Sequence, residues 1–274
     1  MADSSAGWLQ TLVLALIQGL SEFLPISSSA HLVLPSQLLG WPDQGLLFDV
    51  AVHVGTLMAV MVYFRRDLLV LLGDIYPPLA RNQASTGELW RLGVATLPAV
   101  LAGVLLSDTI EQYLRGLEVI ATTTIVFGLL LGWSSRGAQQ VPADVLRTVT
   151  WSGALVIGFA QMLALIPGVS RSGVTITAGL FLGYSSATAA RFSFLMSMPI
   201  IAGAMVFLGL DAFAEGFTKV PLAQMLAAVV VSALSAYATI ALFIGLLARI
   251  GMMPFVWYRL ALGLLLVLIV MFGS

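Results

Sequence analysis

The sequence contains little charge and no cysteine. Asp, Glu, Lys and Arg make up 9% of its 274 residues, whereas soluble domains carry roughly 25%. The absence of cysteine excludes disulfide bonds, thiolate metal ligands and cysteine nucleophiles. A net charge of −1 offers no basic surface, so we expect no nucleic-acid partner. The chain is instead 59% hydrophobic, which is typical of a protein that crosses a membrane several times.

Long apolar stretches take the place of charge. A helix needs about 20 mostly apolar residues to cross a bilayer. Stretches of this kind lie at 48–64, 92–107, 117–133, 188–210, 222–247 and 254–273. Two further regions, 8–40 and 152–184, are apolar but interrupted, and the flanks of each interruption are short for a crossing helix. They predict re-entrant helix pairs, which enter and leave the membrane on one side.

The two interrupted regions resemble each other around Pro25 and Pro167. The matching features are Gln18 and Gln161 before the prolines, Ser28 and Ser170 three residues after them, and a Leu-Gly-aromatic triplet at 39–41 and 182–184. We therefore predict an all-α polytopic membrane protein with a single domain, 1–274, made of two repeats, 8–133 and 152–273. Each repeat would hold a re-entrant pair and three crossing helices. Three crossings between the pairs make the repeats inverted relative to each other.

Arginine predicts the orientation of the chain, because basic loops stay in the cytoplasm. The loops 65–91 and 134–150 are rich in Arg, whereas the loop 108–116 contains two acids and one Arg. The first two loops should therefore face the cytoplasm, with both termini outside. The sequence start, MADSSAGW, has no basic region or cleavage site, so we expect the first apolar segment to be retained.

The first interruption reads QGLSEFLPISSSAH, from Gln18 to His31. Gln18 and Glu22 are four residues apart and share one helix face, where Glu22, helped by the Gln18 amide, would suit Mg²⁺. Ser27, Ser28 and Ser29 are good helix N-caps, and a helix N-terminus attracts anions. Ser28 with His31 as its base is one possible nucleophile, and His31 itself is the alternative. A purely structural polar face and simple helix capping remain open.

The second interruption, PGVSRSG at 167–173, repeats this arrangement. Arg171 offers a planar fork of donors for phosphate oxygens. The further candidates for phosphate binding are Gly168, Ser170, Ser172, Gly173 and Thr175. The repeat symmetry predicts that the two interruptions face each other and together bind a phosphate or pyrophosphate with its metal.

Four other polar residues are weaker candidates. Asp49 and His53 lie one turn apart at the start of an apolar stretch, where structural and site-lining roles are equally plausible. Arg191 and Arg259 are expected to extend to the membrane interface as snorkelling side chains.

Over nearly its whole length the chain resembles the bacterial undecaprenyl-diphosphate phosphatases of the bacitracin-resistance type. The resemblance rests on Gln18-x-x-x-Glu22, on 23-FLPISSSAH-31 and on 167-PGVSRSG-173. Many members have Glu where this chain has Gln18, so Glu22 would hold the metal charge alone. In this family Glu22 looks like the metal-associated acid and Arg171 the phosphate-binding Arg, with Ser28 and His31 as nucleophile and partner.

The resemblance implies an enzyme of the bacterial inner membrane, with its active site facing the periplasm. It would hydrolyse undecaprenyl (C55) diphosphate to the monophosphate and phosphate, and so recycle the lipid carrier for peptidoglycan synthesis and confer bacitracin resistance. It further implies a divalent metal, Mg²⁺ or Ca²⁺. A homodimer is possible. The alternative is an inverted-repeat transporter or flippase for a phosphorylated lipid, since broken helices are common in carriers.

Overall fold

The described part of the chain is helical and contains no strand. The structure is a computed structural model that describes residues 4–42, 44–76, 87–138, 147–215 and 220–272. Its elements are α1 (Ser4–Ser21), α2 (Ser28–Leu39), α3 (Leu46–Tyr63), α4 (Arg65–Leu72), α5 (Glu88–Tyr113), α6 (Leu117–Ala138), α7 (Trp151–Met162), η2 (Leu163–Leu165), α8 (Arg171–Phe181), α9 (Ser186–Glu215), α10 (Leu222–Ile250) and α11 (Met253–Phe272).

Within the described ranges, six helices are long and apolar enough to cross a membrane: α3, α5, α6, α9, α10 and α11. They coincide with the six predicted stretches, which confirms a helical polytopic membrane protein. The helix α4 was not predicted; it begins with Arg65-Arg66-Asp67 and is too short to cross. The predicted basic loops are only partly described, because 77–86 and 139–146 lie outside the described residues.

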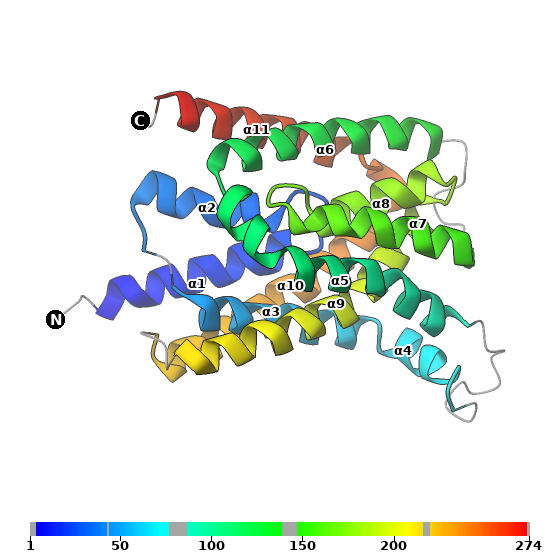
Figure 1. Ribbon diagram of the computed structural model, residues 1–274, viewed down its shortest axis with the longest axis horizontal. Helices are drawn as coiled ribbons and strands as arrows, with labels where there is room; N and C mark the ends of the chain where they lie inside the picture. Colours follow the sequence, from blue (N-terminus) through cyan, green and yellow to red (C-terminus); the bar gives the residue numbers. More distant parts are fainter. Residues whose placement is uncertain (1–3, 43, 77–86, 139–146, 216–219, 273–274) are drawn as a thin grey trace.

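The interrupted regions form two short helix pairs, α1–α2 and α7–α8. In Figure 1 the α1–α2 pair enters the bundle from the end that holds both termini, and α7–α8 enters from the opposite end. Their turns, 22–27 and 163–170, meet in the middle of the bundle; we call them the first and second tip. The equivalence of the halves as inverted repeats stays a prediction.

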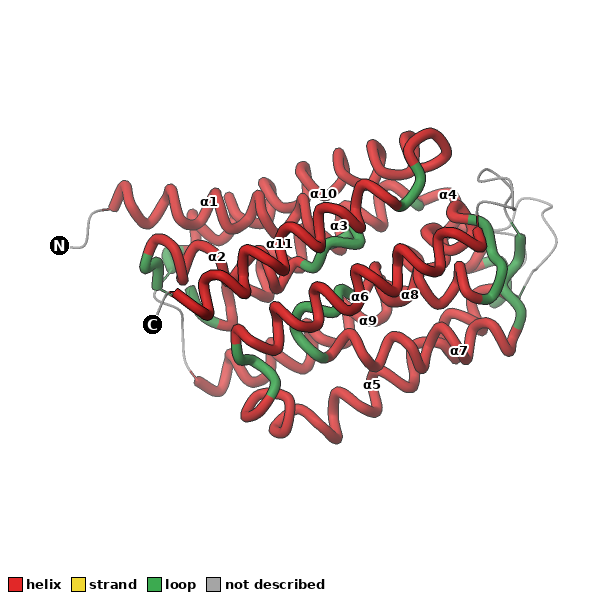
Figure 2. Tube along the Cα trace, turned by 90° about the horizontal axis from the view of Figure 1, so that it is seen from above, coloured by secondary structure: helices red, strands yellow, loops and turns green. Residues whose placement is uncertain are grey.

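Neighbouring helices pack in matching pairs around these tips. The helix α1 packs on α10, and α7 packs on α5, while α3 also contacts α9 and α6 contacts α11 (Figure 2). Glycines permit the close approach: a Cβ on Gly19 would lie 1.9 Å from Ser235 Oγ, and one on Gly158 would lie 2.5 Å from the Ala95 carbonyl oxygen. Each short pair is therefore held against a crossing helix of the other half.

An aromatic cluster anchors the first tip in the core. Phe23 is fully buried and packs edge-to-face on Phe194 of α9, with ring centroids 5.4 Å apart. Phe194 in turn contacts Phe64 and Phe243. Such aromatic pairs add about 0.5–1.5 kcal/mol beyond the burial of their area. The tip is thus tied to the crossing helices by its own side chain.

Candidate active site

Each tip ends at a serine that caps the following helix in an uncommon backbone conformation. Ser27 has φ 75° and its side chain accepts a hydrogen bond from the amide of Ala30, at the start of α2. Ser170 has φ 71° and accepts from the amide of Gly173, at the start of α8. These are the only described non-glycine residues with positive φ. Strain of this kind is typical of functional sites.

The matching caps correct the predicted alignment of the tips. Counting three residues from each proline paired Ser28 with Ser170, but the structure makes Ser27 the counterpart of Ser170. Gln18 and Gln161 each precede their cap by nine residues. The second tip carries one extra residue between proline and cap, so Ser28 corresponds to Arg171.

Each tip contacts the first turn of the helix that follows the other tip, so the two interruptions face each other, as the sequence predicts. The Gly168 amide donates to Ser29 Oγ over 3.0 Å, and Ser172 Oγ donates to the Leu24 carbonyl over 2.8 Å. The first turns of α2 and α8 each bring one serine hydroxyl to the backbone of the opposite tip. The first turns of α2 and α8 are brought together, and their amides without intrahelical partners create a favourable place for an anion.

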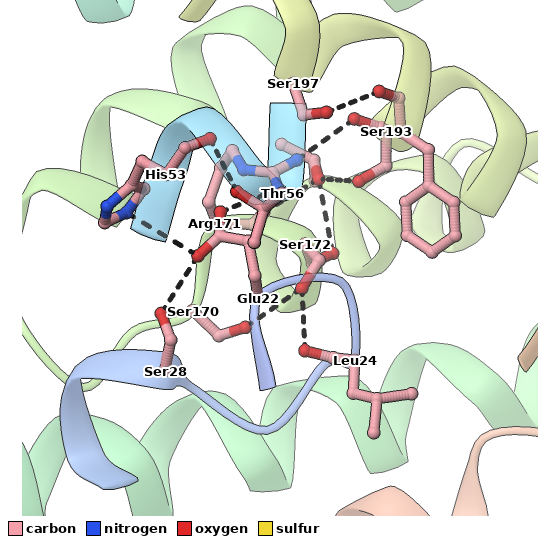
Figure 3. A network of polar contacts seen from close by, with 12 residues as sticks. Glu22, Leu24, Ser28, His53, Thr56, Ser170, Arg171, Ser172, Ser193 and Ser197 are labelled. Atoms are coloured by element: carbon pink, nitrogen blue, oxygen red, sulfur yellow. Dashed lines mark hydrogen bonds and ion pairs between the residues drawn. The ribbon is translucent and has the colours of Figure 1, made fainter. Parts of the chain in front are cut away.

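Glu22 lies at the centre of the site (Figure 3). Its Oε1 is 3.1 Å from Arg171 Nη2, and both side chains are about nine-tenths buried. Its Oε2 accepts from Gln18 Nε2 at 2.9 Å and from Ser28 Oγ at 3.2 Å. The structure thus brings together four of the predicted residues, and the hydroxyl of Ser28 points to a carboxylate.

His53 extends this cluster from α3. Its Nδ1 lies 2.7 Å from the Asp49 carbonyl oxygen, so Nδ1 carries the hydrogen of the neutral ring. Nε2 is then an acceptor, and the Gln18 amide donates to it over 3.1 Å. The same amide nitrogen contacts Glu22, so Gln18 links His53 to the carboxylate. His53, a weaker candidate in the sequence, lies 4.0 Å from Glu22 Oε2.

His31 points away from this cluster. Its Nδ1 donates to the Ser27 carbonyl at 2.6 Å, and Nε2 accepts from Tyr258 Oη at 2.7 Å. The only described side-chain partner of Ser28 Oγ is Glu22. The predicted pairing of His31 with Ser28 is therefore not seen in this arrangement. Tyr258, at the surface of α11, carried no signal in the sequence.

Comparison with known proteins identifies the family. The family model described as "Bacitracin resistance protein BacA" matches residues 11–265. The chain belongs to the BacA family. It is similar to proteins named "Undecaprenyl-diphosphatase": 56% identical to that of Alcanivorax borkumensis, over 94% of this chain and 97% of the relative. The identity is 53% for Hahella chejuensis (93% and 96%) and 52% for Chromohalobacter salexigens (94% and 97%).

In this BacA chain several predicted phosphate ligands also form the frame of the site. The amides of Gly168 and Gly173 donate to Ser29 and Ser170. Thr175 is buried, and its hydroxyl bonds the Arg171 carbonyl at 2.8 Å and Ser193 Oγ at 2.7 Å. Since Arg171 Nη1 also donates to the Ser193 carbonyl, Thr175 and Ser193 orient Arg171. Ser193 was missed by sequence reasoning because a serine within an apolar helix has many structural uses.

Arg259 is fully buried, so the snorkelling prediction was wrong for it, while Arg191 is held in an ion-pair network. Arg191 forms a bidentate pair with Glu88, with N–O distances of 2.6 and 3.1 Å, and also binds Asp67 at 2.8 Å. It thereby joins α9 to α4 and α5. Arg259 has no exposed surface and bonds the backbone of both tips. Arg259 was predicted to lie at the interface because its hydrogen-bond acceptors lie far away in the sequence and leave no local pattern.

The oxygen atoms beside Glu22 are of the type that a hard divalent cation prefers. Among the described residues, no three Asp, Glu or His side chains gather as a metal site. Gln18, whose amide nitrogen contacts Glu22, nevertheless has an oxygen that could bind a cation. This atom, Oε1, is buried without a hydrogen-bond partner in the described structure. Mg²⁺ commonly takes one or two protein ligands and completes its shell with water and substrate phosphate.

A pocket of about 350 Å³ borders the second tip and the first turn of α2. Ser29 lines it from the start of α2 and Pro167 from the second tip; Asp49 lines it from α3, and Trp41 and Arg115 come from loops. Leu14 and Asp49, which line the pocket, lie one helical turn before Gln18 and His53. The pocket therefore lies beside the Glu22 cluster, at the end of the bundle from which α1 and α2 enter.

Proposed function

We propose that this chain hydrolyses undecaprenyl diphosphate to undecaprenyl monophosphate and phosphate. Its membership of the BacA family and its likeness to three proteins named "Undecaprenyl-diphosphatase" support this activity. One observation of the site carries the proposal: Ser28 and Arg171, at the first turns of α2 and α8, both bind Glu22. A hydroxyl, a guanidinium and a carboxylate are thus held where a diphosphate would meet two helix N-termini. The activity would recycle the lipid carrier and confer bacitracin resistance.

Ser28 is our proposed nucleophile. Its Oγ forms a bond to the terminal phosphorus while the anhydride bond breaks, and undecaprenyl monophosphate leaves. The hydroxyl proton passes to Glu22 Oε2, to which Ser28 already donates over 3.2 Å. Water then attacks the phosphorus, the bond to Ser28 Oγ breaks, Ser28 takes its proton back from Glu22, and phosphate is released. Glu22 therefore replaces His31, which the sequence suggested, as the base, because Ser28 bonds Glu22 whereas His31 bonds Ser27 and Tyr258. His31 as the nucleophile is the alternative.

Arg171 and the helix N-termini bind the transferred phosphoryl group in this proposal. Charge on the phosphoryl oxygens is stabilised best by donors that are already oriented. Thr175 and Ser193 hold Arg171, while Ser27 and Ser170 fix the two first turns. The hydroxyl of Ser29 accepts from the Gly168 amide and keeps its own hydrogen for the anion, whereas that of Ser172 donates to the Leu24 carbonyl. His53 Nε2 lies 4.0 Å from Glu22 Oε2 and is placed to take up the proton that Glu22 receives.

Glu22 and Gln18 Oε1 would hold a divalent metal, Mg²⁺ or Ca²⁺. Such an ion, when bound, neutralises charge on the diphosphate. We therefore expect a chelator to abolish phosphate release, and added Mg²⁺ or Ca²⁺ to restore it. Measuring released phosphate before and after the chelator is removed tests this. Full activity in excess chelator would contradict the metal assignment.

The deciding experiment is phosphate release from C15 and C55 prenyl diphosphates by the purified chain in detergent. We expect Ser28→Ala and Glu22→Gln to lower the rate at least about 100-fold, as loss of a catalytic group commonly does. Ser134→Ala is the matched control, because that buried serine only bonds the Leu131 carbonyl of its own helix. Full activity of both site variants would exclude this mechanism, and flux without hydrolysis would favour the transporter.

We also propose that the chain resides in the bacterial inner membrane and that its site opens to the periplasm. The arginine bias of the loops and the position of the pocket beside the termini support this orientation. A homodimer stays a prediction.

A further inference from the structure

Arg259 is a buried cation with an unusual set of partners. It lies on α11 and has no exposed surface. The guanidinium has five N–H donors, and each of its five hydrogen bonds ends on a backbone carbonyl. The acceptors are Val169 at 3.0 Å, Gly168 at 2.9 Å, Pro25 at 3.4 Å, Thr124 at 3.1 Å and Thr123 at 3.4 Å.

Three of these carbonyls belong to the tips. Pro25 is in the first tip, and Gly168 and Val169 are in the second, so one side chain bonds both. The other two acceptors are in α6, which makes α6 and α11 the support on which the tips rest. A charged side chain at membrane depth is costly and is usually kept for function. None of these five bonds reaches a carboxylate, so the charge acts on the backbone of the tips.

The hydrogen bonds of Arg259 lie next to the two strained N-cap serines. Ser27 and Ser170 hold positive φ angles, and such conformations persist only when the surrounding structure fixes them. Val169 directly precedes Ser170, and Pro25 lies two residues before Ser27. The carbonyl and amide of a trans peptide point in opposite directions. The bond from Arg259 to the Val169 carbonyl therefore directs the Ser170 amide away from Arg259.

We propose that Arg259 is a positioning residue for the reaction. It binds the two tips from behind, through their carbonyls, and keeps the first turns of α2 and α8 at the spacing that lets Ser28 and Arg171 meet one phosphate. Its described bonds involve neither of these side chains, so it acts through the backbone. The inference rests on the proposed function, because that function defines the phosphate that the tips share.

Two glycines leave room for this side chain. A Cβ on Gly173, in the first turn of α8, would lie 2.9 Å from Arg259 Nη1. A Cβ on Gly128, in α6, would lie 3.0 Å from Arg259 Cβ and 3.5 Å from its Nε. Gly132, one turn further along α6, is equally tight against α11, but its Cβ would meet Val256 Cγ1 at 3.1 Å. A substitution of Gly128 would therefore displace the Arg259 side chain, whereas a substitution of Gly132 would disturb only the packing of α6 on α11.

The first test replaces the guanidinium of Arg259 and keeps its positive charge. Lysine has three donors, so Arg259→Lys cannot make all five bonds. We expect kcat per folded molecule to fall about 100-fold, as a misplacement of about 1 Å can cause, with a smaller change in KM. Arg191→Lys is the matched control, because it also breaks a multidentate arginine network, yet at Glu88 and Asp67. It should lower the unfolding temperature and leave kcat within about threefold.

A second pair of variants and a binding measurement guard against misfolding. Gly128→Ala should lower kcat at least tenfold more than Gly132→Ala, at similar unfolding temperatures. Inorganic phosphate should raise the unfolding temperature of the wild-type chain and of Arg191→Lys, but not that of Arg259→Lys. If the Arg259→Lys protein matches the wild type in kcat and in phosphate stabilisation, or if the control variants lose kcat equally, the positioning role is wrong. A wild-type chain that is stabilised by phosphate but releases none from prenyl diphosphates would instead refute the proposed function.

Discussion

Glu22 accepts hydrogen bonds from side chains of three helices, α1, α2 and α8. Substitutions at Glu22 therefore affect several partners at once. Arg171 binds one carboxylate oxygen, while Gln18 and Ser28 share the other. The Arg171 and Glu22 side chains are only 10% and 9% exposed. Removing one charge of such a pair leaves the other buried without compensation, which typically costs about 3–5 kcal/mol.

Glu22→Gln should therefore lower both stability and activity. We expect the free energy of unfolding to fall by about 3 kcal/mol, from the unpaired Arg171, and phosphate release to fall at least about 100-fold. Glu88→Gln is a suitable control, because Arg191 keeps Asp67 as a second carboxylate partner. It should keep most of its activity. Equal activity losses in the two variants would indicate a general effect of losing a buried acid.

Ser170 separates the role of a hydroxyl from that of backbone strain. Ser170→Ala loses the N-cap bond and keeps a Cβ at φ 71°, whereas Ser170→Gly loses the bond but fits this φ. We expect the glycine variant to be more stable than the alanine variant by about 1–2 kcal/mol. Phosphate release should fall to the same extent in both, since both lack the hydroxyl.

Thr150, which caps α7 at φ −71°, is the reference for this comparison. The difference between Gly and Ala at Thr150 reports the cap alone and should be about 0.5–1 kcal/mol. Thermal unfolding in one detergent ranks all four variants. An equal difference at both positions would show that Ser170 carries no strain.

Residue types in a short motif were predictable, but their partners were not. The convergence of Glu22, Ser28 and Arg171 follows from two polar interruptions in apolar sequence, because polar groups at membrane depth need one another. His31 was assigned to Ser28 by proximity in sequence, whereas its ring bonds Tyr258, 227 residues away. Arg259 was assigned to the interface because none of its hydrogen-bond acceptors lies near it in the sequence. Contacts made through long-range packing leave no local pattern.

Helices pack closely around the site through small residues, and α3 on α10 is an example. A Cβ on Gly55 would lie 2.4 Å from the Val229 carbonyl oxygen, whereas one on Gly245 would meet nothing within 4 Å. Gly55 lies two residues after His53, so the fit of α3 also sets the position of that ring. The two glycines therefore make a matched pair inside crossing helices.

Gly55→Ala should lower the free energy of unfolding by about 1–3 kcal/mol, because α3 must move away from the backbone of α10. Gly245→Ala should be neutral or slightly stabilising, since alanine favours helix by about 1 kcal/mol over glycine. Thermal unfolding of both variants in the same detergent checks this. Equal unfolding temperatures would mean that the α3–α10 contact can adjust freely.

Helix existence was predictable, and helix registers were less so. Hydropathy located all six crossing helices because an apolar span of sufficient length has few other structures available in lipid. It missed α4, whose mixture of Arg, Asp and Leu gives no span. The register of the tips was one residue wrong, because Gly168 lengthens the second tip and only the capping bonds reveal it.

At the scale of the whole molecule, the site is tied to one end of the bundle. The pocket that borders the second tip is lined by α2, α3 and the loop between α5 and α6, on the side of the two termini. The helix α4 and the network of Arg191 lie at the opposite end (Figure 1). If the loops rich in Arg face the cytoplasm, this pocket lies on the periplasmic side.

The chain's lack of cysteine makes this orientation directly testable. Gln37, near the end of α2, and Tyr76, after α4, are exposed at opposite ends of the bundle. In intact cells whose outer membrane is permeable, a maleimide that cannot cross the inner membrane should label Gln37→Cys and not Tyr76→Cys, because the proposed orientation places only Gln37 in the periplasm. Lysed cells should label both, and the cysteine-free parent neither. The opposite pattern would place the pocket, and with it phosphate release, on the cytoplasmic side.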